Sequence, residues 1–83
     1  MQGKPARITG RPLQRLRRQL FQREPLCRAC MADGRVTVAV IRDHIIPLAE
    51  QGPDTEANVQ PLCQACSDVK TQREAQRGQR RAC

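Results

Sequence analysis

Aromatic side chains are almost absent from this chain of 83 residues, which has one Phe, no Trp and no Tyr. Aromatic residues bury more surface each than other side chains and dominate most protein cores. A domain of this length also buries little apolar surface to begin with. The sequence therefore predicts one small domain that a core of Leu, Val, Ile and Ala does not hold together alone.

Long apolar runs are missing as well. No segment approaches the roughly 20 apolar residues that a membrane-spanning helix needs, and no apolar segment of a signal peptide follows Met1. We therefore expect a cytoplasmic protein without a membrane partner, in a compartment where thiols stay reduced. In that setting the five cysteines favour metal binding over disulfides.

Acidic residues are lacking from the first 23 positions, which hold seven basic residues. Residues 70–83 hold five basic residues and one acid, and the net charge of the chain is +7. Basic ends around a near-neutral middle suit a polyanion, most simply nucleic acid, although a cationic surface with no specific partner remains the alternative. The candidate nucleic-acid-binding residues are Arg11, Arg15, Arg18, Lys70, Arg73 and Arg77.

The first predicted element is a helix over residues 12–24. Its Leu and Phe residues recur at helical spacing, with arginines on the other side. Pro12 fits a first helical turn and Pro25 ends the segment. We expect residues 1–10 to be a flexible basic arm, 11–78 to be the domain and 79–83 to be a basic tail.

The middle of the chain predicts two strands and a second helix. Residues 35–41 alternate and are rich in β-branched side chains, which indicates a strand that runs toward Asp43 and His44 and stops at Pro47. Residues 48–58 then form a loop, and a short second strand begins at Val59. The composition of residues 63–78 favours a helix that ends at Gly78.

Two identical Cys-x-x-Cys pairs flank these elements. Two residues between thiolates allow one turn to supply two ligands to one ion, and two such turns complete the tetrahedral site in which structural zinc is usually held. Zinc binding would supply folding energy that the small core lacks. Buried free thiols or a redox pair do not account for two matched pairs. The predicted ligands are Cys27, Cys30, Cys63 and Cys66, and Cys83 is left as a free thiol.

The only histidine, His44, directly follows Asp43. Adjacent residues of a regular strand point to opposite faces, but a strand end or bulge can turn both toward one site. A neutral imidazole is suited to accept a proton from water near neutral pH, and a hard divalent ion on the carboxylate could stabilise a leaving group. A packed histidine and a turn asparagine, Asn58, are the simpler alternatives.

The segment RDHIIPLAEQGPDTEANVQPLCQACSDVKT, set behind PLCRAC, resembles the HNH endonucleases, and the similarity covers about residues 11–76. The resemblance implies an α+β fold: a small, zinc-stapled ββα-metal unit, here with an N-terminal helix. It also implies that Asp43 binds a catalytic Mg²⁺, Mn²⁺ or Ni²⁺, that His44 is the general base, and that Asn58 braces the loop. The four cysteines would hold structural Zn²⁺.

One position departs from the family pattern. The last histidine of the motif, which usually binds the catalytic metal, is Ser67 here. A hydroxyl is a poorer ligand than an imidazole, although it could act through a bound water. Asp68 does not simply replace the histidine, because one residue along a helix turns the side chain by roughly 100°.

Two functions follow from the resemblance. The first is a metal-dependent DNA endonuclease, either monomeric or homodimeric, in a bacterial host or encoded by a phage. The second is a weakened or inactive zinc-stapled DNA-binding module. A third reading is a structural partner in a phage packaging or recombination assembly, which the cationic ends would also suit.

Overall fold

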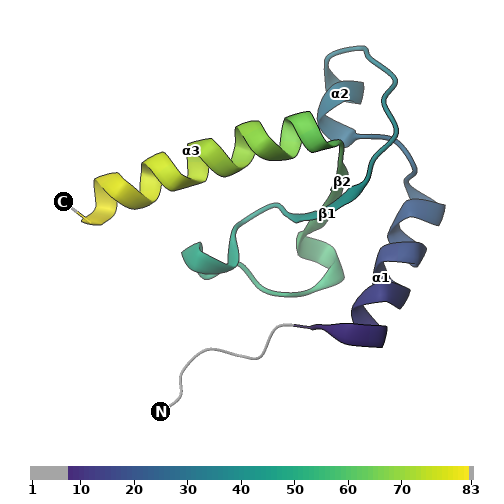
Figure 1. Ribbon diagram of the computed structural model, residues 1–83, viewed down its shortest axis with the longest axis horizontal. Helices are drawn as coiled ribbons and strands as arrows, with labels where there is room; N and C mark the ends of the chain where they lie inside the picture. Colours follow the sequence, from purple (N-terminus) through teal and green to yellow (C-terminus); the bar gives the residue numbers. More distant parts are fainter. Residues whose placement is uncertain (1–7, 83) are drawn as a thin grey trace.

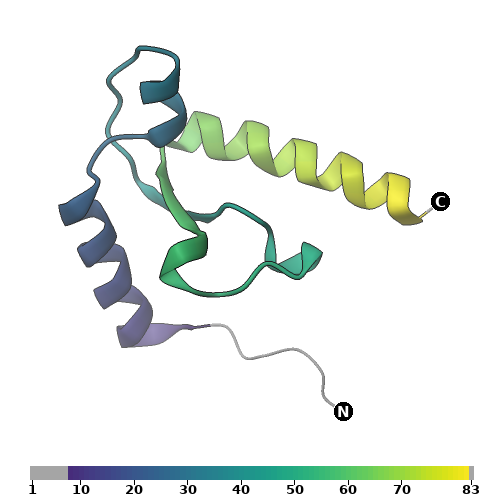
Figure 2. The same cartoon turned by 180° about the vertical axis from the view of Figure 1, so that it is seen from behind.

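The computed structural model describes the backbone of residues 8–82 and the side chains of residues 8–78. Two short strands lie between two longer helices (Figures 1 and 2). The elements, in order, are α1 (Gly10–Arg23), α2 (Arg28–Ala32), β1 (Ile41–His44), the short 3₁₀ helices η1 (Leu48–Glu50) and η2 (Glu56–Asn58), β2 (Val59–Leu62) and α3 (Gln64–Ala82). The predicted α+β class with an N-terminal helix is confirmed.

The sheet is a single antiparallel pair of strands. Its register sets Ile41 opposite Leu62, and His44 opposite Val59 at the other end, without interruption. Val59 and Leu62 are almost fully buried, as is Leu20 from α1. The buried core is therefore small and aliphatic, as the lack of aromatic residues predicts.

The predicted strand begins too early, at Arg35, although it includes the observed strand Ile41–His44. The regular strand begins only at Ile41, and the preceding segment makes one isolated bridge, between Leu26 and Val38. The alternation is real, but Val36, Val38 and Val40 face solvent, whereas Ala39 between them is buried. Alternation indicates an extended chain with one buried and one exposed side. It does not show where that chain pairs, and β2 pairs only with Ile41–His44.

The N-terminal helix is confirmed, and it begins two residues before Pro12, at Gly10. Leu20 is buried on its inner face, and Leu13, Leu16 and Phe21 are half-buried. Of the expected flexible arm, residues 1–7 lie outside the described part of the chain. Ile8 donates its backbone N–H to Asp54 Oδ2 at 2.9 Å, so the segment just before α1 contacts the loop between the strands.

The expected end of the last helix at Gly78 is wrong, because α3 continues to Ala82. A glycine inside a helix costs only about 1 kcal/mol relative to Ala, and its neighbours Arg77 and Gln79 are good helix formers. The short α2 within the first cysteine pair was not predicted, since five residues are too few for a periodic pattern. No helix within residues 8–82 is long and apolar enough to cross a membrane.

Candidate functional site

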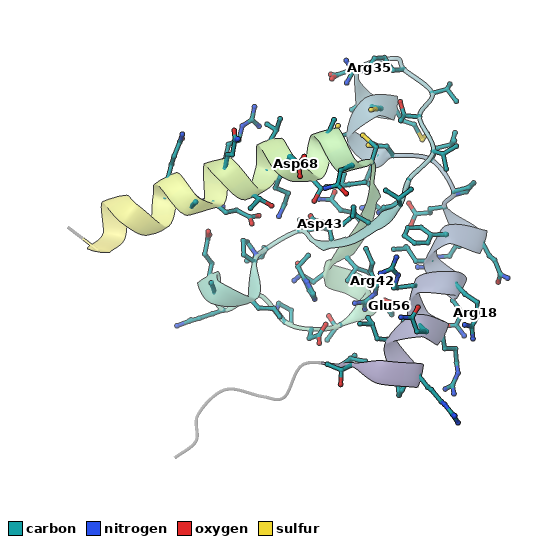
Figure 3. All side chains as sticks on the ribbon, in the orientation of Figure 1. Arg18, Arg35, Arg42, Asp43, Glu56 and Asp68 are labelled. Carbon is teal, nitrogen blue, oxygen red and sulfur yellow. The ribbon has the colours of Figure 1, made fainter. Side chains whose placement is uncertain are left out.

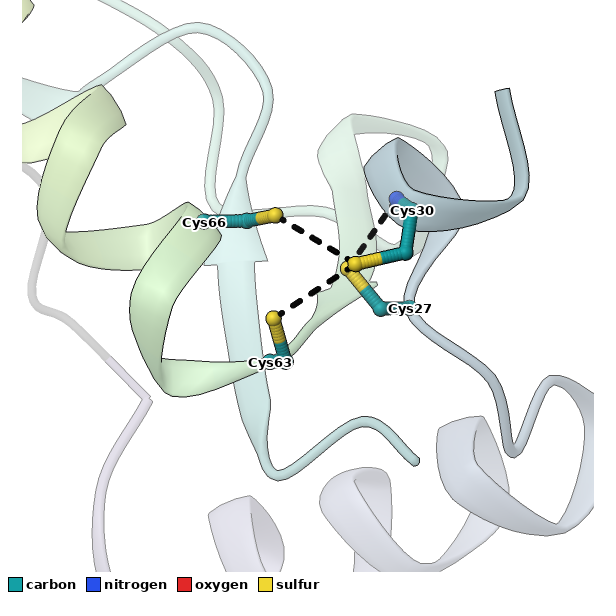
Figure 4. Close-up of side chains that lie close together, drawn as sticks. All are labelled: Cys27, Cys30, Cys63 and Cys66. Atoms are coloured by element: carbon teal, nitrogen blue, oxygen red, sulfur yellow. Dashed lines mark hydrogen bonds between the residues drawn. The ribbon is translucent and has the colours of Figure 1, made fainter. Parts of the chain in front are cut away.

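The four cysteines converge from elements far apart in the sequence (Figure 4). Cys27 and Cys30 lie at the start of α2, and Cys63 and Cys66 lie at the start of α3. All four Sγ atoms lie within 4.8 Å of one another. Cys30 Sγ is 3.8 Å from Cys63 Sγ and 3.6 Å from Cys66 Sγ. A tetrahedron with metal–sulfur bonds of ~2.3 Å has sulfur–sulfur edges of ~3.8 Å, so this cluster is positioned to bind a metal.

The electrostatics of the cluster also fit a cation. Hydrogen bonds from the side chains of Thr37 and Arg35 lower the pKa of Cys30 to about 6. Hydrogen bonding to the surrounding sulfurs, Cys63 first, raises the pKa of Cys66 to about 12. Thiols packed this closely cannot all ionise in the absence of a cation. A bound divalent ion lets all four become thiolates, and a closed set of four thiolates is a structural zinc centre.

Asp43 faces α3. Its Oδ2 accepts a hydrogen bond from Gln60 Nε2 at 3.0 Å, because the two residues are directly opposite in the sheet. The same oxygen lies 3.2 Å from Lys70 Nζ of α3. Lys70 also donates to the His44 backbone oxygen at 2.7 Å and pairs with Glu74 one turn further along. The ammonium thus joins α3 to the end of β1.

The environment of Lys70 keeps its charge in place. Although partial burial works in the opposite direction, the hydrogen bonds to Glu74 and Asp43 raise the pKa of Lys70. Only 22% of its side chain is exposed. Lys70 is also a predicted nucleic-acid-binding residue, and in the structure its ammonium contacts Asp43, Glu74 and the His44 carbonyl.

His44 has an acidic partner of its own. Its Nε2 lies 2.8 Å from Asp54 Oδ1, and both side chains are 14% exposed. Arg42, whose side chain is 4% exposed, lies 3.9 Å from Asp54 and 3.0 Å from Glu56. Figure 3 shows Arg42 and Glu56 between the sheet and α1. A cavity of about 160 Å³ lies here, lined by Ile8, Leu13, Arg17, Arg42, His44 and Asp54.

Asp43 and His44 face opposite sides of the sheet. Arg42 and His44 share Asp54 as a partner, whereas Asp43 between them contacts Gln60 and Lys70. The register of β1 continues through both residues, so no bulge re-aims either of them. β1 therefore keeps ordinary strand alternation, and the two candidates reach one substrate only across the edge or end of the strand.

Asn58 ties the loop after β1 together. Its Oδ1 accepts from the Ile46 amide at 2.9 Å, and its Nδ2 donates to the carbonyls of Ile46 and Pro53 at 2.9 and 2.8 Å. The residue is 6% exposed. Gly52 completes this packing, because a Cβ there would lie 1.9 Å from the Ile46 oxygen. The loop that carries Asp54 is therefore fixed from both sides.

Ser67 lies inside α3, where its amide donates to the Cys63 oxygen at 3.0 Å, and it does not cap the helix. It precedes Lys70 by three residues, so both lie on the same helix face. Asp68 is exposed and accepts from Gln64 at 2.8 Å, and Figure 3 shows it on α3. Among the described residues, the four cysteines are the one cluster of three or more His, Cys, Asp or Glu residues that could hold a metal.

The remaining basic candidates lie on two helices. Arg11, Arg15 and Arg18 are exposed on α1, where spacings of four and three residues put them on one face. Arg73 and Arg77 are exposed on α3. Arg77 pairs with Glu50 at 2.9 Å, whereas no ion pair of Arg11, Arg15 or Arg18 is seen among the residues that the structure describes.

Comparison with known proteins assigns this arrangement to a family. The family model for HNH endonuclease matches residues 27–73, more than half of the chain. The chain belongs to the HNH endonuclease family. The matched segment spans both cysteine pairs together with Asp43, His44, Asn58 and Ser67. The resemblance inferred from the sequence is confirmed. Membership of this family makes the protein a nuclease.

A solved structure supports the assignment. The chain is similar to the HNH endonuclease of the deep-sea thermophilic bacteriophage GVE2, whose crystal structure was determined with manganese ion. The two sequences are 34% identical. The similarity covers 82% of this chain and 77% of that one, with a TM-score of 0.68. No curated protein matches this chain.

Two features of the site were not predicted from the sequence. Asp54 stands in a Gly-Pro-Asp segment that indicates only a turn. Gln60 is an ordinary polar strand residue. Both become partners of candidate residues through the pairing and loop closure seen in the structure, and the sequence spacing carries no signal for either contact.

Proposed function

We propose that this HNH endonuclease is a metal-dependent DNA endonuclease that hydrolyses phosphodiester bonds, with His44 as the general base and Asp43 as a ligand of a catalytic divalent ion. The observation that carries the proposal is the placement of these neighbours on opposite faces at the end of β1. In-line displacement puts the attacking and leaving oxygens on opposite sides of phosphorus. A phosphate at this strand end could meet the base on one side and the ion on the other.

The donor set fits an ion that protein and substrate hold together. Mg²⁺ is usually bound by one or two carboxylates and substrate phosphates, and it retains several waters. Asp43 offers one carboxylate, and Ser67, on the α3 face that also carries Lys70, would contribute through a water. Such an ion would stabilise charge on the leaving oxygen. The cleavage experiment below compares Mg²⁺, Mn²⁺ and Ni²⁺.

His44 performs the proton transfer in this proposal. A neutral imidazole accepts a proton from water most effectively when its pKa is near the working pH. Asn58 supports this step indirectly, since its three hydrogen bonds hold the loop on which the partner of His44 lies. We also infer that the cysteine cluster holds Zn²⁺, which fixes the start of α3 relative to α2.

DNA binding in this proposal comes from exposed arginines. Arg11, Arg15 and Arg18 on α1 and Arg73 on α3 are exposed and can neutralise phosphates without reading bases. This predicts binding that weakens steeply as salt rises and depends little on sequence.

A second candidate function is a DNA-binding module that does not cut. Two observations favour it: Ser67 replaces the expected imidazole ligand, and the ammonium of Lys70 already lies 3.2 Å from Asp43. Both features would weaken binding of a divalent ion without affecting the arginines on α1.

Cleavage of supercoiled plasmid by the zinc-loaded protein tests these functions. We expect nicked or linear product in Mg²⁺, Mn²⁺ or Ni²⁺, no product without a divalent ion, and loss of at least about 100-fold in rate for His44→Ala. Cys83→Ser, outside the matched segment, is the control and should cut normally. A folded protein that shifts DNA in a gel but leaves it intact in every metal would favour the binding module.

A further inference from the structure

The Asp54 carboxylate gathers three donors around one side chain. Oδ1 lies 2.8 Å from His44 Nε2 and 3.9 Å from Arg42 Nη1, and Oδ2 accepts from the Ile8 amide at 2.9 Å. Asp54 is ten residues beyond His44 and belongs to the loop rather than to the strand. Its position is therefore set from three directions, by β1, by the segment before α1 and by its own loop.

These contacts determine which nitrogen of His44 can act. The amide of Ile8 first, and then His44 and Arg42, hold the pKa of Asp54 below its usual value, so the carboxylate is ionised at neutral pH. An ionised carboxylate only accepts hydrogen bonds. In the neutral form of the imidazole, which is the form that acts as a base, Nε2 donates to Asp54 and the lone pair is on Nδ1.

We propose that Asp54 is a positioning residue of the nuclease reaction: it holds the His44 ring through Nε2 and presents Nδ1 as the atom that accepts the proton from water. The inference rests on the proposed function, since it concerns how the general base is oriented. A carboxylate that orients the base histidine is a general device of catalytic sites. Here the carboxylate is that of Asp54, which lies on the loop that Asn58 and Gly52 hold closed.

The pairing with Arg42 offers the competing explanation, in which Asp54 only stabilises the fold. Arg42 has Glu56 as a nearer partner, at 3.0 Å against 3.9 Å for Asp54. Glu56 is therefore the residue that a purely structural ion pair would use. Asp54 differs from it in contacting the imidazole directly, and a matched pair of variants separates the two roles.

The single histidine makes the first test direct. In ¹⁵N-labelled, zinc-loaded protein the only imidazole signals are those of His44. We expect an Nε2-bound proton that is protected from exchange in the wild type, that Asp54→Ala loses, and that Glu56→Gln retains. Asp54→Asn keeps an acceptor oxygen, so we expect it to retain part of this protection.

Plasmid cleavage supplies the second test. Asp54→Ala should lower kcat roughly 10- to 100-fold, with KM for DNA within about two-fold of wild type, because support of a ligand or base is worth that much. Asp54→Asn should recover part of the loss, and Glu56→Gln should cleave normally. Zinc content and circular dichroism show whether each variant is folded. If Asp54→Ala does not fold, Asp54→Asn is used for the comparison of kcat.

Two results would overturn the inference. One is an imidazole proton that stays protected in Asp54→Ala, which would mean that Asp54 does not hold the ring. The other is an unchanged kcat although the protection is lost. If the wild type cuts no DNA, the proposed function fails separately, and the resonance alone then decides whether Asp54 holds His44.

Discussion

Ser67 takes the place at which the sequence motif predicts a last histidine, and its surroundings indicate what this would change in the proposed site. It lies on the face of α3 that also carries Lys70, whose ammonium contacts Asp43. In the proposed site, Ser67 offers no imidazole to share an ion with Asp43, and the Lys70 ammonium is already next to the carboxylate. Affinity for the catalytic ion is therefore the property most directly affected by this residue.

Ser67→His should strengthen divalent metal binding. We expect the affinity of the zinc-loaded protein for Mn²⁺ to rise at least roughly 10-fold, because an added direct ligand should matter no less than an outer partner does. Electron paramagnetic resonance of free Mn²⁺ measures this without any need for cleavage. Asp68→His is the matched control, since it lies ~100° around the helix. Equal affinities for wild type and Ser67→His would contradict the predicted ligand position.

Asn58→Ala should destabilise the protein. The variant leaves the Ile46 amide and the carbonyls of Ile46 and Pro53 without their partner in a buried loop. At about 1 kcal/mol for each hydrogen bond, the free energy of unfolding should fall by about 3 kcal/mol. Urea denaturation of the zinc-loaded protein measures it. Gln60→Ala, which loses one half-buried hydrogen bond, should cost less, and a loss below about 1 kcal/mol for Asn58→Ala would contradict the bracing role.

At the scale of elements, α3 is attached to the rest of the molecule near its beginning and its middle. Cys63 and Cys66 fix its first turn, Lys70 joins it to β1, and Arg77 pairs with Glu50 of η1. Beyond Arg77 the helix continues to Ala82 (Figure 1).

Gly78→Ala should increase the helicity of the end of α3. No atom outside the helix lies within 4 Å of where the new Cβ would be, and the gain in helix propensity is at most about 1 kcal/mol. We expect higher helical ellipticity with unchanged zinc content. Gly52→Ala is the contrasting variant, because its Cβ would clash with the Ile46 oxygen and open the loop. A loss of helicity in Gly78→Ala would indicate that the helix ends at Gly78 in solution.

For the whole molecule, the cysteine cluster takes the place of an aromatic core. The buried residues around it are Cys27, Cys30, Cys63 and Leu62, so the metal site lies within the main hydrophobic cluster. Structural zinc binding in small domains contributes about 10–16 kcal/mol, which is comparable to the whole stability of a typical domain, about 5–15 kcal/mol. Loss of the metal should therefore unfold the protein rather than loosen one end.

Cys63→Ser should abolish zinc binding and cooperative folding together. Elemental analysis and thermal denaturation measure the two effects, and we expect one zinc per chain in the wild type and none in the variant. Cys83→Ser should bind zinc and unfold like wild type. A Cys63→Ser protein that unfolds cooperatively without metal would show that the aliphatic core is sufficient.

The sequence by itself determined the elements that depend on local chemistry. Periodicity and proline placement predicted α1, and the repeated Cys-x-x-Cys spacing predicted the metal cluster. The residues around Asp43, His44 and Asn58 predicted the family. Each of these patterns lies within a short segment, so a single sequence is enough to recognise it.

Tertiary structure decided what depends on contacts between segments. The alternating valines indicated an extended chain, yet only pairing with β2 set the strand at Ile41–His44 and turned Asp43 and His44 to opposite faces. Loop closure brought Asp54 to His44, and helix docking brought Lys70 to Asp43. Sequence spacing does not encode these partners, because each contact exists only when the loop and the helix fold back onto the same four-residue strand.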